Sequence, residues 1–255
     1  MNKVERFREL HASGCFVMPN PWDRGSAAVL AQLGFPALAT TSSGFAWSIG
    51  KQDNGITLDD ALEHFRVMSA AVEVPLNGDF EGGFAVDPDA VARNYAAVAK
   101  TGLAGVSIED ADHGKLLDFA LSVERVRAAR SIDIVLTARC EAYLVNDVPE
   151  VIRRLTAYAD AGADCLFAPG IRDIEVVRTI VREVAPKPVN VLVASDFTTV
   201  AEMRDAGVRR ISVGGALARA AWTGFLTAAR EIAEQGTFTN LARAISGADL
   251  NAKFL

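Results

Sequence analysis

Eight short apolar segments of β type recur along the chain and alternate with helical patterns, and this alternation limits the fold more than any other feature of the sequence. The segments lie at 15–18, 36–42, 74–80, 105–110, 132–139, 164–169, 188–193 and 209–215. Between them, apolar residues recur at spacings of three and four, which is typical of amphipathic helices, and several of these stretches end in glycine, as helix C-caps do. Apolar strands that alternate with amphipathic helices predict a parallel sheet covered by helices.

Eight strand–helix units in 255 residues match an α/β fold of the closed (β/α)8 TIM-barrel type. A doubly wound open sheet is the alternative. The barrel is favoured because similar helix–strand joints are spread evenly along the chain and no GxGxxG motif follows the first segment. No linker divides the sequence, so we expect residues 1–255 to form one barrel domain. Residues 216–255 are expected to form a C-terminal helical extension, which either packs on a neighbouring subunit or is an ordinary eighth helix.

Composition excludes several classes of function. The chain has 26 basic and 32 acidic side chains and no block of Lys or Arg, so we expect no nucleic-acid binding. No apolar run is long enough to cross a bilayer, and the charged start MNKVERFREL does not resemble a secretory signal, so we expect a cytoplasmic protein that binds no membrane. Cys15, Cys140 and Cys165 lack the spacing of a disulfide framework or a zinc site, and we expect them in the core.

Acidic side chains gather where the predicted strands end, the edge of a barrel that carries its active site. Asp79 and Glu81 are two residues apart after the third segment, and Glu109 ends the fourth. Neighbouring carboxylates repel one another unless a cation lies between them, and oxygen ligands without His or Cys favour Mg²⁺ or Mn²⁺. The three acids therefore predict a metal site. Each one alone is better explained as a helix cap or a solvated loop charge, and only their shared placement favours the metal.

Arg139 ends an otherwise apolar strand, where an unpaired guanidinium is costly to bury. Its partner is either Glu141, within the chain, or a substrate carboxylate held by two parallel hydrogen bonds. The turn at Ser42, Ser43 and Gly44 offers hydroxyls and backbone amides, and glycine there allows a ligand to approach the backbone closely.

Six motifs in order carry a family resemblance. NPWDRGSAAVLAQLGFPAL, TTSSG with a downstream Asp53, PLNGDFEGGF, GVSIED, LTARCEAY and AGADCLF together resemble the isocitrate lyase/phosphoenolpyruvate mutase superfamily over most of the chain. The resemblance implies a Mg²⁺-dependent enzyme on a (β/α)8 barrel that acts on 2-oxo acids or on substrates cleaved to them. It also implies a homotetramer in which a C-terminal helix is exchanged between subunits.

The resemblance also implies roles for individual residues. On its pattern, Asp79, Glu81 and Glu109 bind the metal, directly or through water. The other matching positions are the oxo-acid-binding amides of Ser43, Gly44 and Phe45, the carboxylate-binding Arg139, the active-site Asp53, and the substrate-binding Asn190 and Arg219.

The chain departs from the lyase pattern in three places. The KKCGH-type loop with its catalytic Cys is missing, and the corresponding segment DADHGKLLD offers only His113 or Lys115 for proton transfer. Cys140 is expected to face away from the site. Pro169 and Leu192 replace polar residues of the methylisocitrate lyase pattern, which predicts a substrate smaller than a tricarboxylate.

The leading hypothesis is a Mg²⁺-dependent lyase that cleaves a C–C bond in a small 2-oxo acid or related dicarboxylate through a metal-stabilised enolate. Oxaloacetate decarboxylation ranks above isocitrate-type cleavage, because CO₂ departs without a proton and needs no Cys acid. Two alternatives stay open, namely P–C bond chemistry on phosphonopyruvate and a non-catalytic protein that binds 2-oxo acids.

Overall fold

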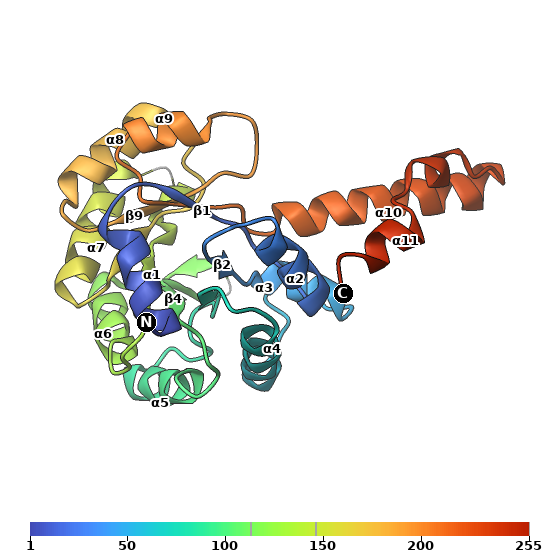
Figure 1. Ribbon diagram of the computed structural model, residues 1–255. Helices are drawn as coiled ribbons and strands as arrows, with labels where there is room; N and C mark the ends of the chain where they lie inside the picture. Colours follow the sequence, from blue (N-terminus) through green and yellow to red (C-terminus); the bar gives the residue numbers. More distant parts are fainter. Residues whose placement is uncertain (113, 146, 255) are drawn as a thin grey trace.

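The computed structural model describes residues 1–112, 114–145 and 147–254. Eight parallel strands form one sheet in the order β1–β10–β9–β8–β7–β4–β3–β2 (Figure 1). Each strand lies inside one of the eight predicted segments. Their bounds are β1 Phe16–Met18, β2 Leu38–Ala39, β3 Leu76–Gly78, β4 Gly105–Glu109, β7 Val135–Arg139, β8 Cys165–Phe167, β9 Val189–Leu192 and β10 Arg210–Ser212.

The sheet curls until its two edge strands meet. The backbone N–H of Ala39 on β2 donates to the carbonyl oxygen of Pro19, directly after β1, at 3.1 Å. A doubly wound open sheet would keep its edges apart, so the predicted TIM barrel is confirmed. A short antiparallel hairpin, β5 Ala111–Asp112 with β6 Lys115–Leu116, follows β4 at the mouth of the barrel.

Helices surround the sheet and shield its outer face. Apolar side chains of strands and helices, such as Leu38, Phe65, Leu76, Val106 and Leu136, form the core between the two layers. The helices that follow or flank the strands are α1 Lys3–Ala12, α2 Arg24–Gln32, α3 Ser42–Ser48, α4 Leu58–Ala71, α5 Pro88–Val98, α6 Phe119–Ala129, 3₁₀ helix η1 Glu141–Val145, α7 Val148–Asp160, α8 Ile174–Glu183 and α9 Val200–Asp205.

Helix α1 packs across the end of the barrel opposite the mouth. Its Phe7 is fully buried in a small cluster with Phe16 and Val135. A Cβ at Gly105 on β4 would lie 2.6 Å from the Phe7 ring, so only glycine at this position lets the ring enter the barrel.

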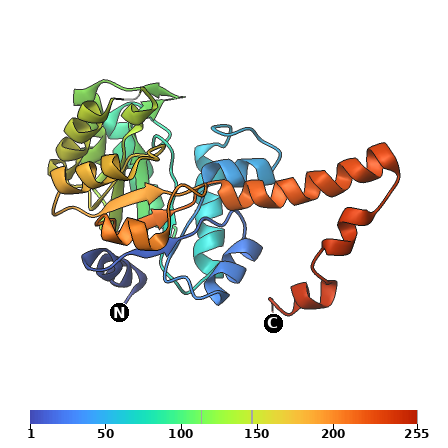
Figure 2. The same ribbon diagram turned by 90° about the horizontal axis from the view of Figure 1, so that it is seen from above.

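The C-terminal arm, defined as α10 Ala216–Gln235, 3₁₀ helix η2 Thr239–Arg243 and α11 Gly247–Asn251, extends away from the barrel (Figures 1 and 2). In α10 only Ala218 and Glu231 are buried, while Phe225 is 60% exposed. The arm therefore does not form an ordinary eighth helix against the sheet. In the described part of the chain, no helix combines the length and the apolar character that crossing a membrane requires.

Candidate active site

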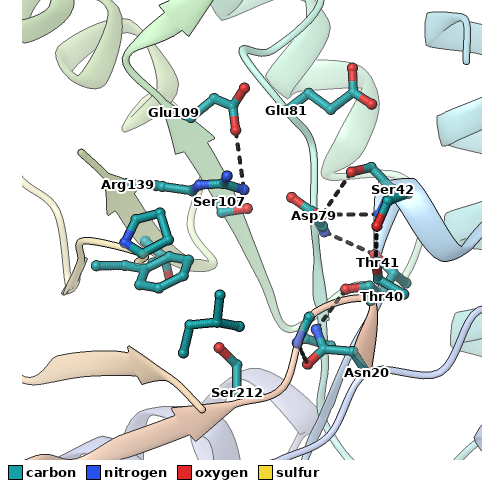
Figure 3. A pocket seen from close by; sticks show the side chains of 18 of the residues that line it. Asn20, Thr40, Thr41, Ser42, Asp79, Glu81, Ser107, Glu109, Arg139 and Ser212 are labelled. Carbon is teal, nitrogen blue, oxygen red and sulfur yellow. Dashed lines mark hydrogen bonds and ion pairs between the residues drawn. The ribbon is translucent and has the colours of Figure 1, made fainter. Parts of the chain in front are cut away.

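A cavity of about 330 Å³ opens at the carboxyl ends of the strands (Figure 3). Side chains two residues apart on one strand point to the same face, so each strand presents an upper and a lower residue to the barrel interior. All eight strands do so here, and five of the pairs provide most of the polar lining. These five pairs are Asn77 and Asp79, Ser107 and Glu109, Thr137 and Arg139, Asn190 and Leu192, and Ser212 above Arg210.

Asp79 is held in place by the beginning of helix α3. The backbone N–H and the hydroxyl of Ser42 donate to its Oδ2 at 3.0 and 2.9 Å, and its own N–H donates to Thr40 Oγ1 (Figure 3). Both Ser42 bonds reach the same oxygen, so within the described residues Oδ1 is left for another partner. The side chain is thus oriented before any ligand binds.

Glu81 has an unusual environment for an acid. Burial, followed by the negative charges of Asp79, Glu109 and Asp53, raises its pKa to about 8. Its Oε1 is buried, and in the described part of the chain it has no hydrogen-bond partner. Its backbone φ of +48° lies in the left-handed region, which residues other than glycine rarely adopt. Such strain and repulsion are characteristic of functional sites.

Glu109 and Arg139 form an ion pair inside the cavity. Glu109 Oε2 lies 3.2 Å from Arg139 Nη1. Burial nevertheless raises the pKa of Glu109 to about 7, because the lowering by Arg139 does not cancel the effect of burial together with the negative charges of Glu141 and Asp79. A second cation near Glu109 would therefore be favourable.

Both expected types of partner for Arg139 are compatible with its position. Its Nε donates to Glu141 within the chain, so the internal partner exists. Burial opposes the charge of Arg139, but the carboxylates of Glu109 and Glu141 outweigh that effect and raise its pKa. The guanidinium also lies 5.7 Å from the centre of the Phe167 ring and lines the cavity. Its geometry is fixed on one side and open to a ligand on the other.

A buried network behind the cavity positions this arginine. Asp110 Oδ1 accepts from the backbone N–H of Glu141 at 2.7 Å, and Asp110 Oδ2 accepts from the Tyr158 hydroxyl at 2.6 Å and from Arg154 at 3.1 Å. Asp110 thereby connects the end of β4 to the residue that holds Arg139. The network was not apparent from the sequence, because its other members lie 31 to 48 residues from Asp110.

The segment after β2 lies only partly in the cavity. Ser42 and Ser43 line it, whereas Gly44 and Phe45 pack behind it. A Cβ on Gly44 would lie 2.7 Å from Thr41 Cγ2 and 3.1 Å from Ala218 Cβ, so close packing against α10 already requires glycine here. The Phe45 ring stacks on His64 with centroids 3.8 Å apart. Oxo-acid binding by the Gly44 and Phe45 amides stays a prediction.

The remaining predicted residues, the active-site Asp53 and the substrate-binding Asn190 and Arg219, lie in different places. Asp53 is exposed at the cavity rim, and Asn190 is buried within it. Arg219 is exposed in the first turn of α10 and does not line the cavity.

The residues at which the chain departs from the lyase pattern lie in different surroundings. Pro169 and Leu192 line the cavity as expected. Lys115 is exposed on β6, and Cys140 is buried in the core, where desolvation raises the pKa of its thiol. His113 lies outside the described residues.

The three acids fit a hard divalent cation. They offer only oxygen ligands, and a cation would offset their repulsion and give the buried Glu81 Oε1 a partner. Among the described residues, no three His, Cys, Asp or Glu side chains converge on one point. The described side chains therefore do not form a three-ligand metal site by themselves, and an ion such as Mg²⁺ would take most of its ligands from water and substrate.

Sequence reasoning missed several residues of the cavity. Asn20 accepts at its Oδ1 from the backbone N–H groups of Val213 and Gly214, both at 2.9 Å, and so joins β1 to β10. Apart from Asn190, the lower layer of polar residues, with Arg210 at its base, was also missed. Its signal in the sequence is a polar residue at alternate positions of otherwise apolar strands.

Comparisons with known proteins show the family to which the chain belongs. The family profile described as phosphoenolpyruvate phosphomutase matches residues 7–233. The 2-methylisocitrate lyase of Salmonella typhimurium is 33% identical over 201 residues, which cover 71% of this chain and 68% of that protein.

Solved structures resemble the whole chain. A Burkholderia cenocepacia J2315 protein, provisionally assigned as a lyase/mutase, is 44% identical with a TM-score of 0.95 and covers 99% of this chain and 96% of its own. Oxaloacetate acetylhydrolase in complex with 3,3-difluorooxalacetate is 25% identical with a TM-score of 0.88, covering 99% and 93%. The chain is therefore an enzyme of the isocitrate lyase/phosphoenolpyruvate mutase superfamily.

Proposed function

We propose that this enzyme is a Mg²⁺-dependent lyase that cleaves a C–C bond in a small 2-oxo acid or a related dicarboxylate. The observation that carries the proposal is one cavity in which Asp79, Glu81 and Glu109 lie beside Arg139. The acids supply a site for a divalent cation, and the arginine supplies a site for a carboxylate. A 2-oxo acid needs both, because its carbonyl and carboxylate oxygens chelate a cation while its negative charge pairs with a guanidinium.

The chain's own residues would position the reacting groups. Asp79, fixed by Ser42, would hold the cation together with Glu81 and Glu109, directly or through water. When bound, the cation would polarise the 2-oxo group and stabilise the enolate that forms as the bond breaks. Arg139 would bind the carboxylate and orient the scissile bond, and its ion pairs hold the guanidinium ready for this.

The hairpin at the mouth bears on the choice of reaction. In its described residues, which are Ala111, Asp112 and 114–116, no cysteine is present to act as an acid. Lys115 is exposed rather than aimed into the cavity. A reaction in which the enolate takes its proton from solvent suits such a site. Oxaloacetate is therefore the first substrate to test, and the similar oxaloacetate acetylhydrolase structure supports that choice.

The test is a panel of 2-oxo acids and 2-hydroxy diacids assayed with Mg²⁺, with product identification. Asp79→Asn should lower kcat/KM by at least about 100-fold, because it removes one negative charge from the metal site. Asp89→Asn, an exposed acid on α5, is the matched control and should keep full activity. Full activity of Asp79→Asn would contradict the metal role. Tight oxalate binding without turnover of any substrate would instead indicate a binding protein.

We also propose that the C-terminal arm packs on a neighbouring subunit in a homotetramer. Its exposed apolar side chains include Trp222, Phe225 and Phe238, which are 37%, 60% and 62% exposed. Exposed large apolar side chains gathered on one segment are typical of subunit interfaces. Within the subunit, Glu231 fixes the arm's own bend by accepting from the N–H groups of Thr239 and Asn240.

A further inference from the structure

The interior of the barrel beneath the three acids is polar. The layers of a TIM barrel are usually filled by branched apolar side chains. Here Ala39, Ser107 and Ser212 are small, and the cavity continues between them to Thr137 and Arg210. Figure 3 shows Ser107 and Ser212 lining the same pocket as Glu109 and Arg139. The cavity is therefore deeper than a metal–oxalate chelate needs.

Arg210 forms the floor of this cavity. Its side chain is only 2% exposed, and it is oriented by three acceptors from different elements. Nε donates to Asn190 Oδ1 and Nη2 to Thr137 Oγ1, both at 2.9 Å. Nη1 lies 3.2 Å from His11 Nε2. His11 Nδ1 lies 2.7 Å from the Phe7 carbonyl oxygen, which can only accept, so Nδ1 carries the proton and Nε2 accepts from Arg210.

All three acceptors are neutral, so they orient the guanidinium without balancing its charge. In the described part of the chain, no carboxylate forms an ion pair with Arg210. A guanidinium has five N–H donors, and three are used. Burying a cation without an anion costs several kcal/mol. Asn77 Oδ1, in the same cavity, is also buried without a described hydrogen-bond partner.

We propose that Arg210 binds the distal carboxylate of a dicarboxylic substrate whose 2-oxo acid end is held at Arg139 and the metal-binding acids. This inference rests on the proposed function and names its substrate class. Thr137, which contacts Arg210, precedes Arg139 by two residues on β7, a rise of about 6.6 Å along the strand. A four- or five-carbon dicarboxylate covers such a span.

The floor would also select against other substrates. A distal carboxylate supplies two acceptors for the free N–H groups of Arg210, and the hydroxyls of Ser107 and Ser212 line its path. A monocarboxylic 2-oxo acid with an alkyl tail would leave the guanidinium unpaired and place methyl groups against polar atoms. Discrimination of this kind is large when a buried polar group loses its partner.

Calorimetry with two ligands tests the inference in the presence of Mg²⁺. Oxalate occupies only the chelate end, whereas 3,3-difluorooxaloacetate carries the additional distal carboxylate. Arg210→Gln should weaken binding of the second ligand by about 10- to 100-fold, the range expected for a lost charge-assisted hydrogen bond, and leave oxalate binding within about twofold. Arg210→Lys should restore part of the loss, because it keeps the charge.

Two further variants separate this role from a structural one. Arg209→Gln removes the same charge from the neighbouring position of the chain, where Arg209 donates to the Gly14 carbonyl outside the barrel, and should change neither affinity. Ser107→Leu fills the passage while leaving Arg210 intact and should also weaken only 3,3-difluorooxaloacetate, so the test does not depend on the folding of the Arg210 variants. Equal weakening of both ligands, or of neither, would overturn the inference. Wild-type protein that fails to bind oxalate with Mg²⁺ would instead contradict the proposed function.

Discussion

His11 connects the floor of the cavity to the stability of the barrel, and its substitution should remove a defined part of the enzyme's acid sensitivity. Burial, and then the charge of Arg210, lowers the pKa of His11 from 6.5 to about 3. Below pH 6.5 the unfolded chain binds a proton at this residue, whereas the folded protein does not until about pH 3. The free energy of unfolding therefore decreases as the pH falls through this window.

The size of the effect follows from the two pKa values. At pH 5, protonation of His11 stabilises the unfolded state relative to the folded state by about 2 kcal/mol. This stabilisation reaches its maximum of about 5 kcal/mol below pH 3. His64, whose pKa burial lowers to about 4, adds a similar amount at pH 5. Glu81 and Glu109 act in the opposite direction, because their pKa values are raised on folding. Only comparison with a variant isolates the contribution of His11.

His11→Gln is the appropriate variant, because glutamine offers Arg210 an acceptor and does not titrate. Urea unfolding of both proteins in EDTA, at one protein concentration, gives the free energy of unfolding at pH 7.5 and pH 5. The variant loses edge contacts with Phe7 and Phe16 and should be less stable at pH 7.5. Between the two pH values, however, it should lose about 2 kcal/mol less than the wild type. Equal losses would refute the neutral, accepting role of His11.

Three further results are expected. Arg139→Lys should lower kcat/KM for the best substrate of the panel by at least about tenfold, because an ammonium cannot reproduce the planar fork; an unchanged value would exclude carboxylate binding by Arg139. EDTA should abolish turnover and Mn²⁺ should restore it; turnover that persists in EDTA would show that the reaction does not require a metal. Mg²⁺ at 100 times its Kd should also raise the free energy of unfolding by about 2.7 kcal/mol, measured by thermal unfolding. Trp222→Lys on the exposed arm should shift sedimentation toward smaller species, whereas an unchanged sedimentation coefficient would show that Trp222 does not contribute to an interface.

The barrel was predictable because its signal is local and repeated. Each strand is a short apolar run, and each run has a helical pattern beside it. The positions of Asp79, Glu109 and Arg139 followed from the same rule, since all three come at the ends of parallel strands. The path of the C-terminal arm did not follow, because an amphipathic helix carries the same pattern whether it packs on its own barrel or on a neighbour.

The parts that were missed depend on contacts between distant residues. The bond from Ser42 to Asp79 spans 37 positions, and those from Asn20 to β10 span more than 190. Arg209 and Arg210 are adjacent in the sequence, and only the pleat of β10 decides which one enters the barrel. Gly44 has a packing reason in addition to its predicted role in ligand approach, and the sequence alone does not separate the two.

The short polar side chains inside the barrel have a consequence for how this scaffold can change. Stability comes mainly from the apolar shell between the sheet and its helices, while Ser107 and Ser212 face a hollow. Exchanging such residues alters the contour and polarity of the hollow without repacking that shell. Substrate preference could then change through a few substitutions with little loss of folding stability. Laboratory evolution directed at these two positions should accordingly yield altered selectivity more often than loss of folding.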